Sequence, residues 1–263
     1  MRPALAPPAA RIAIVSAMAE ELRALVPQLQ GASQVERAGR VFHCGSLHGL
    51  AVVLVQSGIG KVAAATTAAL LAAEFAPAAL LFTGVAGGLA PGVKVGDVVL
   101  ARELLQHDMD ASPLFPRYEV PLTGRSRFAV DAALGDRLAA AARAALANAA
   151  GTPIAAHFAE FGIVAPTVHE GLVISGDRFV ATAAESEALR RALPDALAVE
   201  MEGAAVAQVC ADFGLRFALL RVISDRADDS AHVDFLAFTR EFASVLTRTI
   251  VAAAIGSGAC SAD

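Results

Sequence analysis

Two carboxylates in the last third of the chain stand where chemistry is expected. Glu202 comes just before a helical pattern of apolar side chains, which recur at Val206, Val209, Cys210 and Phe213. An apolar run of strand length begins at Phe217 and ends in Ser224 and Asp225. Glu202 therefore opens a helix, and Asp225 lies at the carboxyl end of a strand. Ligands bind outside the carboxyl ends of strands in α/β folds, so we expect both carboxylates to act on a ligand.

Arg221 interrupts the same apolar strand. A charged side chain in a buried strand is costly unless it is paired or faces a polar cavity, and the nearby carboxylates are its expected partners. A structural ion pair and a functional role explain Arg221 equally well from the sequence pattern.

A third carboxylate, Glu21, follows the first predicted strand, at residues 12–15. Apolar residues with helical spacing come next, at Leu22, Leu25, Val26 and Leu29, which puts Glu21 in the first turn of a predicted helix. An acidic residue there commonly does no more than complement the helix dipole. The pattern alone favours this explanation over a side chain that points into a site.

A glycine-rich turn follows a predicted strand pair at residues 41–44 and 50–56. The turn reads Ser57-Gly-Ile-Gly-Lys61 and opens an Ala-rich helix that should run to about Phe75. It lacks the first glycine of a phosphate loop, and valine follows Lys61 where that motif has Ser or Thr. We therefore interpret the glycines as a tight turn near a ligand.

The next predicted strand, residues 79–82, leads into Thr83-Gly-Val-Ala-Gly-Gly-Leu89, which predicts a turn where main chain approaches a ligand or simply bulges. The other predicted elements are strands at residues 95–100 and 171–175 and helices at residues 131–149, 182–192 and 235–255. Strands that alternate with helices predict one mostly parallel sheet.

Residues 105–127 are a long irregular segment, and such segments in compact domains are usually functional or disordered. Phe115 and Tyr118 within it are expected to cover an apolar pocket or to contact a second subunit. His107, Asp108 and Asp110 are metal ligands by type, but no wider ligand cluster accompanies them, and polar loop structure is the better explanation.

The composition argues against several classes of function. The chain has 263 residues, a net charge of −5 and scattered basic residues, so neither nucleic acid nor an anionic membrane is an expected partner. Its longest uncharged stretch, residues 75–93, is too broken by proline and glycine to span a membrane. The cysteines, Cys44, Cys210 and Cys260, have no paired spacing and indicate reduced thiols in a cytoplasm. One domain at residues 11–255 with loose termini at 1–10 and 256–263 is expected.

Seven motifs in register give the chain a family resemblance: Ala17-Met-x-Glu-Glu21, Ser57-Gly-Ile-Gly-Lys-Val-Ala63, Thr83-Gly-x-Ala-Gly-Gly-Leu-Ala-Pro91, Val95-Gly-Asp97, Ser175-Gly-Asp-x-Phe179, Val199-Glu-Met-Glu202 and Arg221-x-Ile-Ser-Asp225. The chain resembles the 5′-methylthioadenosine/S-adenosylhomocysteine nucleosidases of the purine nucleoside phosphorylase superfamily. The resemblance implies a single α/β domain with a mixed, partly barrel-like sheet flanked by helices. It also implies a homodimer with no metal or organic cofactor, which hydrolyses the bond between adenine and ribose of a purine thionucleoside.

The resemblance also implies the catalytic roles. Such cleavage passes through an oxocarbenium-like ribosyl cation, so the departing base must be protonated and water delivered. Asp225 would be the general acid toward adenine N7, supported by Ser224, and a positioned acid contributes roughly 10²–10⁴-fold in rate. Glu21 would activate the attacking water with the help of Arg221. Glu202 would hold the ribose hydroxyls, and its place at a helix amino terminus should favour the ionised form.

The same resemblance assigns the residues that bind substrate. Met201 would pack against the sugar and Phe179 near the purine, while the Val180 main chain reads the adenine edge. The 5′-alkylthio group would be covered by Phe235 and by the loop of Phe115 and Tyr118, the loop coming from either subunit. The chain departs from the family pattern at Val85, where many members have Ser, and across residues 113–124.

Three alternatives stay open. A phosphorylase uses phosphate in place of water, but resembling phosphorylases have an arginine after the first strand, where this chain has Glu21. A carboxylate there repels phosphate and favours hydrolysis. A nucleosidase for futalosine or another 6-substituted purine nucleoside is the second alternative. A nucleoside-binding protein without catalysis is the third, and it is expected to lack Glu21 or Asp225, which are both present.

Overall fold

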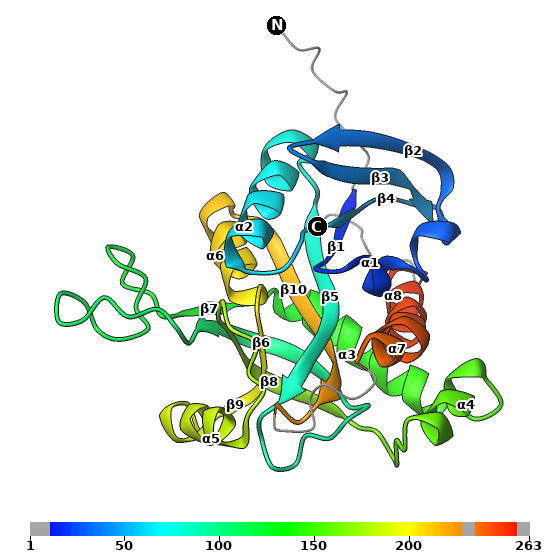
Figure 1. Ribbon diagram of the computed structural model, residues 1–263. Coiled ribbons are helices and arrows are strands. Elements are labelled where there is room, and N and C mark those ends of the chain that lie inside the picture. The colour runs from blue at the N-terminus through cyan, green and yellow to red at the C-terminus, as the bar shows by residue number, and fades with distance from the viewer. Residues whose placement is uncertain (1–10, 228–234, 257–263) are drawn as a thin grey trace, which may run out of the picture.

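The computed structural model describes residues 11–227 and 235–256, which Figure 1 shows as one body of strands and helices. The strands are β1 (Ile12–Ser16), β2 (Gln30–Arg37), β3 (Arg40–Leu47), β4 (Leu50–Gln56), β5 (Ala79–Gly88), β6 (Val98–Gln106), β7 (Arg127–Ala129), β8 (Val168–Ser175), β9 (Ala196–Glu200) and β10 (Arg216–Asp225). The helices are α1 (Ala19–Leu22), α2 (Lys61–Leu70), α3 (Ala132–Ala147), α4 (Pro153–Glu160), α5 (Ala183–Ala192), α6 (Gly203–Phe213), α7 (Phe235–Ala237) and α8 (Ser244–Gly256). A short 3₁₀ helix, η1, covers Val26–Gln28. Two short π-helical segments are η2 (Leu71–Phe75) and η3 (Phe238–Ala243).

Within the described chain, five strands close a barrel. β5 pairs in parallel with β10, and β10 pairs antiparallel with β6. Parallel pairings then join β6 to β8 and β8 to β9, and β9 returns to β5 in antiparallel orientation. β1, β4, β3 and β2 continue the sheet outward from β5. The predicted mixed, partly barrel-like α/β domain is confirmed.

The more general expectation of a mostly parallel sheet is wrong, because antiparallel pairings are as common as parallel ones. Antiparallel neighbours include strands that lie far apart in sequence, such as β6 and β10. Alternation of strands and helices along the chain does not reveal how such strands pair.

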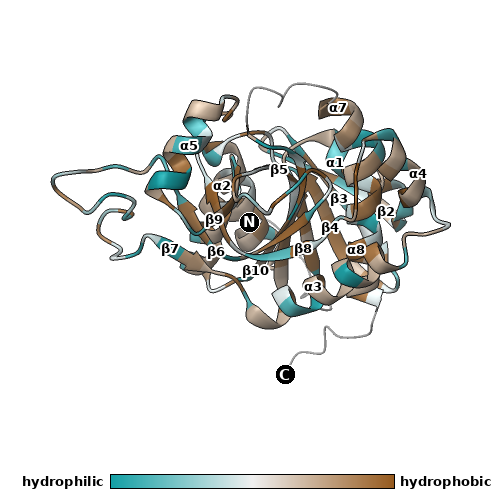
Figure 2. Ribbon diagram, turned by 90° about the horizontal axis from the view of Figure 1, so that it is seen from below, coloured by the Kyte–Doolittle hydropathy of each residue, from teal (hydrophilic) through white to brown (hydrophobic). Residues whose placement is uncertain are grey.

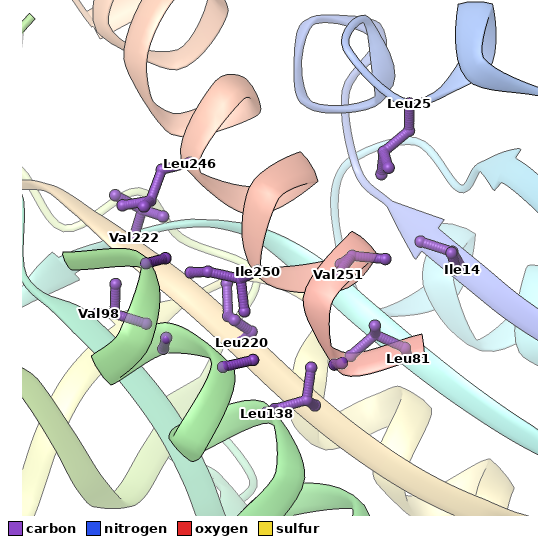
Figure 3. Packing of buried hydrophobic residues seen from close by; sticks show 14 of the residues in the cluster. Ile14, Leu25, Leu81, Val98, Leu138, Leu220, Val222, Leu246, Ile250 and Val251 are labelled. Carbon is purple, nitrogen blue, oxygen red and sulfur yellow. The ribbon is translucent and has the colours of Figure 1, made fainter. Parts of the chain in front are cut away.

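Strands such as β1 and β4 are mostly apolar and buried because helices cover both of their faces, whereas the outer strand β2 is polar and mostly exposed. In β1, Ile12 and Ile14 belong to a core with α3 and α8, whereas Ala13 and Val15 belong to a second core with α2 and α6. Figure 3 shows the first core, in which side chains of α8 lie against β10 and α3. Figure 2 shows the same arrangement as brown strands inside a partly teal shell of helices. Two opposed cores fix the strands and hence the residues at their ends.

Several local predictions need correction. The helix predicted from the spacing of Leu22 to Leu29 is only the four-residue α1, and η1 follows it with Pro27 near its start. Proline cannot donate the backbone hydrogen bond that a continuing helix needs. The glycines after Phe82 form no turn, since β5 runs on to Gly88. The sequence interpretation also missed β2, β9 and α4.

Residues 107–126, called the arm from here on, connect β6 to β7 and extend away from the body in Figures 1 and 2. Leu114 and Leu122 of the arm are 84% and 90% exposed. No helix in residues 11–227 or 235–256 is long and apolar enough to cross a membrane. The predicted loose termini fall outside the described residues, apart from Gly256, which ends α8.

Candidate active site

A pocket lies where the carboxyl ends of β1, β5, β9 and β10 meet. Nine of the residues predicted from the sequence line it: Glu21, Val85, Phe179, Val180, Met201, Glu202, Ser224, Asp225 and Phe235. Arg221 is fully buried on β10 close to these residues, at 1% exposed. These residues come from six separate segments of the chain, so their assembly depends on the closed barrel.

The register between β5 and β10 arranges the base of the site. Arg221 pairs with Gly84, and Asp225 pairs with Gly87 after a bulge at the end of β10. A Cβ atom on Gly84 would collide with both the Glu21 carboxylate and the Arg221 guanidinium. Glycine is therefore required at position 84, because the Glu21 carboxylate and the Arg221 guanidinium occupy the space that a side chain would need.

Glu21 is held by backbone amides from two elements. Met18 N donates to Oε2 at 2.9 Å, and Val85 N donates to Oε1 at 3.0 Å. Burial raises the pKa of Glu21 above the ordinary value, although Arg221 and these amides act in the opposite direction. A raised pKa makes the carboxylate a better proton acceptor than an exposed glutamate.

Arg221 is the positive centre beneath the pocket. Its Nη2 donates to Glu200 at 2.5 Å and lies 3.8 Å from Oε2 of Glu202, while its guanidinium stacks over the Phe82 ring at 4.4 Å. Burial works against the charge, but Glu200, Glu202 and Glu21 together raise the pKa of Arg221. Nε and Nη1 have no hydrogen-bond partner among the described residues. Arg221 therefore forms the ion pair expected of a structural residue and also keeps the free donors that a functional residue needs.

Glu202 is the N-cap residue of α6, as predicted, and its Oε1 accepts a 2.9 Å hydrogen bond from Gly60 N. The expectation that this position favours the ionised form is wrong. Burial is the main cause that raises the pKa of Glu202 to about 8, and nearby Glu200 adds to it, whereas Arg221 and the Gly60 amide oppose it. Loss of hydration outweighs the helix dipole because Glu202 is only 5% exposed.

Asp225 ends β10 at the opposite side of the pocket base. Its Oδ2 accepts a 2.7 Å hydrogen bond from the Ser224 hydroxyl, and its Oδ1 accepts one of 2.7 Å from Ala227 N. Asp225 is 7% exposed, so part of its carboxyl group reaches the pocket. The two hydrogen bonds fix the orientation of its carboxyl group.

Apolar side chains form the walls above these polar groups. Phe179 and Phe235 meet edge to face with ring centroids 6.3 Å apart, and Met201 and Val180 line the same pocket. Aromatic walls with a few fixed polar groups are typical of sites for small organic ligands.

Phe115 and Tyr118 do not line this pocket. Tyr118 packs at the base of the arm against a small apolar cluster, and Arg117 lies over its ring at 4.8 Å. Asp108, considered as a metal ligand, instead accepts a 2.6 Å hydrogen bond from Lys61 Nζ.

Known proteins of similar sequence show which family this chain belongs to. A sequence model of the phosphorylase superfamily matches residues 11–255. The 5′-methylthioadenosine/S-adenosylhomocysteine nucleosidase of Anoxybacillus flavithermus is 36% identical over 232 residues, which cover 88% of this chain and 92% of that protein. The chain belongs to this nucleosidase family. The resemblance read from the seven motifs is thereby confirmed.

Solved structures of the phosphorylase superfamily have the same fold. The nucleosidase of Neisseria meningitidis, in complex with methylthio-immucillin-A, is 34% identical with a TM-score of 0.81 and covers 95% of this chain and 100% of its own. A futalosine hydrolase mutant of Helicobacter pylori is 30% identical with a TM-score of 0.79 and covers 95% and 100%.

The sequence interpretation gave no role to Glu200, which this nucleosidase-family chain buries at the centre of the site. Glu200 accepts hydrogen bonds from the amides of Glu202 and Gly203, from Arg221 and from the Ser175 hydroxyl. One sequence signal was available, because a buried Arg221 required a carboxylate partner. Periodicity could not tell which of Glu200 and Glu202 would take that place.

Proposed function

We propose that this chain hydrolyses the N-glycosidic bond of 5′-methylthioadenosine, S-adenosylhomocysteine or both, and releases adenine. The observation that supports this most is the placement of three charged side chains against Gly84 and Gly87 of β5. Glu21 meets Arg221 across the first glycine, and Asp225 lies over the second. One pocket thus offers a proton acceptor and a proton donor at separate points of its base.

Asp225 is the general acid in this proposal. As the bond between ribose C1′ and adenine N9 breaks, its electron pair moves into the purine, and N7 takes a proton from the Asp225 carboxyl. The Ser224 hydroxyl keeps the carboxyl oriented. General acid catalysis of this kind contributes on the order of 10²–10⁴-fold in rate.

Glu21 is the proposed base. Water attacks C1′ of the ribosyl cation and gives a proton to Glu21, which forms the free sugar. The Nη1 donors of Arg221, which have no partner among the described residues, provide hydrogen bonds for this water or for a ribose hydroxyl. A carboxylate whose pKa is raised by burial accepts the proton readily.

Glu202 and Met201 are proposed to bind the ribose. The Gly60 amide fixes one carboxyl oxygen of Glu202, so the other is oriented between Arg221 and the pocket. Phe179 is proposed to stack near the purine and the Val180 main chain to bind its edge. Phe235 then lies beside the 5′ substituent, since its ring is the neighbour of Phe179.

Water is favoured over phosphate by charge. Glu21, Glu200 and Glu202 all lie near the buried cation Arg221 and raise its pKa against the effect of burial, so the base of the pocket has an excess of carboxylates. A phosphate dianion needs several unpaired cationic or amide donors in such a place. A phosphorylase is therefore disfavoured.

A homodimer is proposed as the working form, with the arm of one subunit placed over the pocket of the other. Two features support this. Leu114 and Leu122 are almost fully exposed on the arm, and Phe115 and Tyr118 do not line the pocket of their own subunit. Exposed apolar side chains of this size favour a protein contact. A cytoplasmic location is proposed from Cys44 and Cys210, which are free thiols.

Adenine release tests the proposal directly. The protein is incubated with 5′-methylthioadenosine, S-adenosylhomocysteine, adenosine or futalosine, without phosphate and then with it. In phosphate-free buffer 5′-methylthioadenosine should give adenine and free methylthioribose, and S-adenosylhomocysteine should give adenine and the free ribosylhomocysteine. Cleavage of futalosine is followed by release of its own base. A sugar phosphate formed only with phosphate would instead identify a phosphorylase. Faster cleavage of futalosine than of either adenine nucleoside would assign the activity to the other relative.

A further inference from the structure

Arg178 is set apart from the other charged residues of the pocket. The lining carboxylates Glu21, Glu200, Glu202 and Asp225 are all buried, whereas the Arg178 side chain is 74% exposed. Ile59 and Phe179, which line the same pocket, are 59% and 44% exposed. These exposed residues form the mouth of the pocket, and Arg178 is the cation placed there.

The position of Arg178 is fixed by the start of α5. Its Nη2 forms an ion pair with Oε1 of Glu185. The other oxygen, Oε2, accepts hydrogen bonds from Thr182 Oγ1 at 3.0 Å and Ala181 N at 3.3 Å, while Thr182 in turn accepts one from Glu185 N. Thr182 is the N-cap residue of α5, and these contacts with the first turn of the helix hold Glu185 as an anchor for the arginine.

The proposed function places ribose against the buried Glu202 and the 5′ substituent beside Phe235, whose ring meets that of Phe179 at this mouth. A methylthio group is short and uncharged, whereas a homocysteine tail ends in a carboxylate and an ammonium group. An arginine beside a glutamate has the matching pair of charges. The guanidinium has five N–H donors, so its contact with Glu185 leaves others for a second carboxylate.

Resting on the proposed function, we propose that Arg178 is a specificity-determining residue that binds the carboxylate of an amino-acid tail on the 5′ sulfur. Glu185 lies beside it to face the ammonium group. The chain then favours S-adenosylhomocysteine over 5′-methylthioadenosine through this contact.

The experiment compares three substrates on two variants. The substrates are 5′-methylthioadenosine, S-adenosylhomocysteine and its decarboxylated analogue, which keeps the ammonium group. Arg178→Ala is compared with Arg191→Ala, because Arg191 is on the same helix as Glu185, is 68% exposed and pairs with Glu187 away from the pocket. Adenine release gives kcat/KM for each substrate at low and high salt, and thermal unfolding checks the fold of both variants.

Arg178→Ala is expected to lower the ratio of kcat/KM for S-adenosylhomocysteine to that for 5′-methylthioadenosine by about two- to fivefold, the range of an exposed charge pair. The ratio for the decarboxylated analogue should stay unchanged, the loss should shrink in high salt, and Arg191→Ala should behave as the unaltered protein. An equal fall for all three substrates, or an unchanged ratio, would overturn the role of Arg178. Lack of hydrolysis of every substrate by the unaltered protein would instead overturn the proposed function, and this inference with it.

Discussion

The backbone amide of Val85 donates a 3.0 Å hydrogen bond to Oε1 of Glu21, which ties a helix carboxylate to the middle of a barrel strand. The side chain at position 85 takes no part in this contact, because the donor is the main-chain amide. Glu21 is therefore held whichever side chain stands at that position. Its role can be tested without disturbing the strand.

Glu21→Gln should bind substrate but hydrolyse it slowly. Glutamine keeps an oxygen for the Val85 amide, but it cannot take a proton from water, so kcat should fall by roughly 10²–10⁴-fold with a small change in KM. Steady-state adenine release measures both quantities. In the unaltered protein, kcat/KM should decline on the acid side with a midpoint above the ordinary glutamate pKa, because burial raises the pKa of Glu21. Unchanged turnover in the variant would assign water activation to another group.

Asp225→Asn should retain the fold and lose at least about 100-fold in turnover. Asparagine keeps the oxygen that accepts from Ala227 N, and its amide can donate to the Ser224 hydroxyl, so both local hydrogen bonds persist in altered form. Asp212→Asn, on the exposed face of α6, is the matched control. Adenine release from both variants is compared, with circular dichroism to check the fold. Near-normal turnover would exclude Asp225 as the general acid.

Glu202→Gln should stabilise the protein while it impairs catalysis. The folded-state pKa of Glu202 is about 8, above the unfolded value of about 4.3, so the folded protein binds one more proton between these values. Stability from this group is then full below about pH 4.3 and is lost as pH rises toward 8. Glutamine has no charge to desolvate, and its benefit should grow over the same range.

Melting temperatures of the Glu202→Gln variant and the unaltered protein at pH 5 and pH 8 test whether the stabilisation grows as pH rises. The variant should gain at least about 4 °C at pH 8, which corresponds to roughly 1–2 kcal/mol for a chain of this size, and much less at pH 5. Asp212→Asn, an exposed substitution on α6, supplies the baseline. A variant less stable than the unaltered protein at pH 8 would mean that Glu202 is ionised and well paired in the empty site.

The carboxylates of the site were predictable because their local positions are informative. Asp225 follows an apolar run of strand length, and Glu202 precedes a helical pattern, both of which depend only on nearby residues. The structure has β10 and α6 at those places. For Glu21 the local pattern favoured a dipole role, and only the family motif indicated otherwise. Its neighbours Val85 and Arg221 come from strands that periodicity cannot bring together.

The rest of the site depends on long-range pairing that the sequence pattern does not encode. Glu200 reaches Arg221 only because β9 and β10 belong to the same closed barrel. Gly84 and Gly87 were interpreted as a turn, since glycine weakens strands, but β5 uses them to admit side chains from α1 and β10. Burial is likewise the main cause that raises the pKa of Glu202, and burial is a property of the assembled fold.

Lys61 joins three segments that surround the pocket, so its loss should affect substrate binding as well as stability. Its Nζ binds Asp108 at 2.6 Å and Gln106 at 3.1 Å, and its backbone N donates to Asp177 at 2.7 Å. The preceding amide, Gly60 N, holds Glu202. Lys61→Met keeps the length of the side chain but removes the charge, which should loosen the turn that carries this amide.

A loss of about 1 kcal/mol in the free energy of unfolding is expected for Lys61→Met, since Lys61 and Asp108 are only partly exposed. KM should rise more than kcat falls, because Glu202 is proposed to hold ribose while Asp225 and Glu21 stay in place. Lys94→Met alters an exposed lysine outside the pocket and should change neither. Urea unfolding and steady-state adenine release measure the two effects. Loss of stability with an unchanged KM would reduce Lys61 to a purely structural link between the arm and α2.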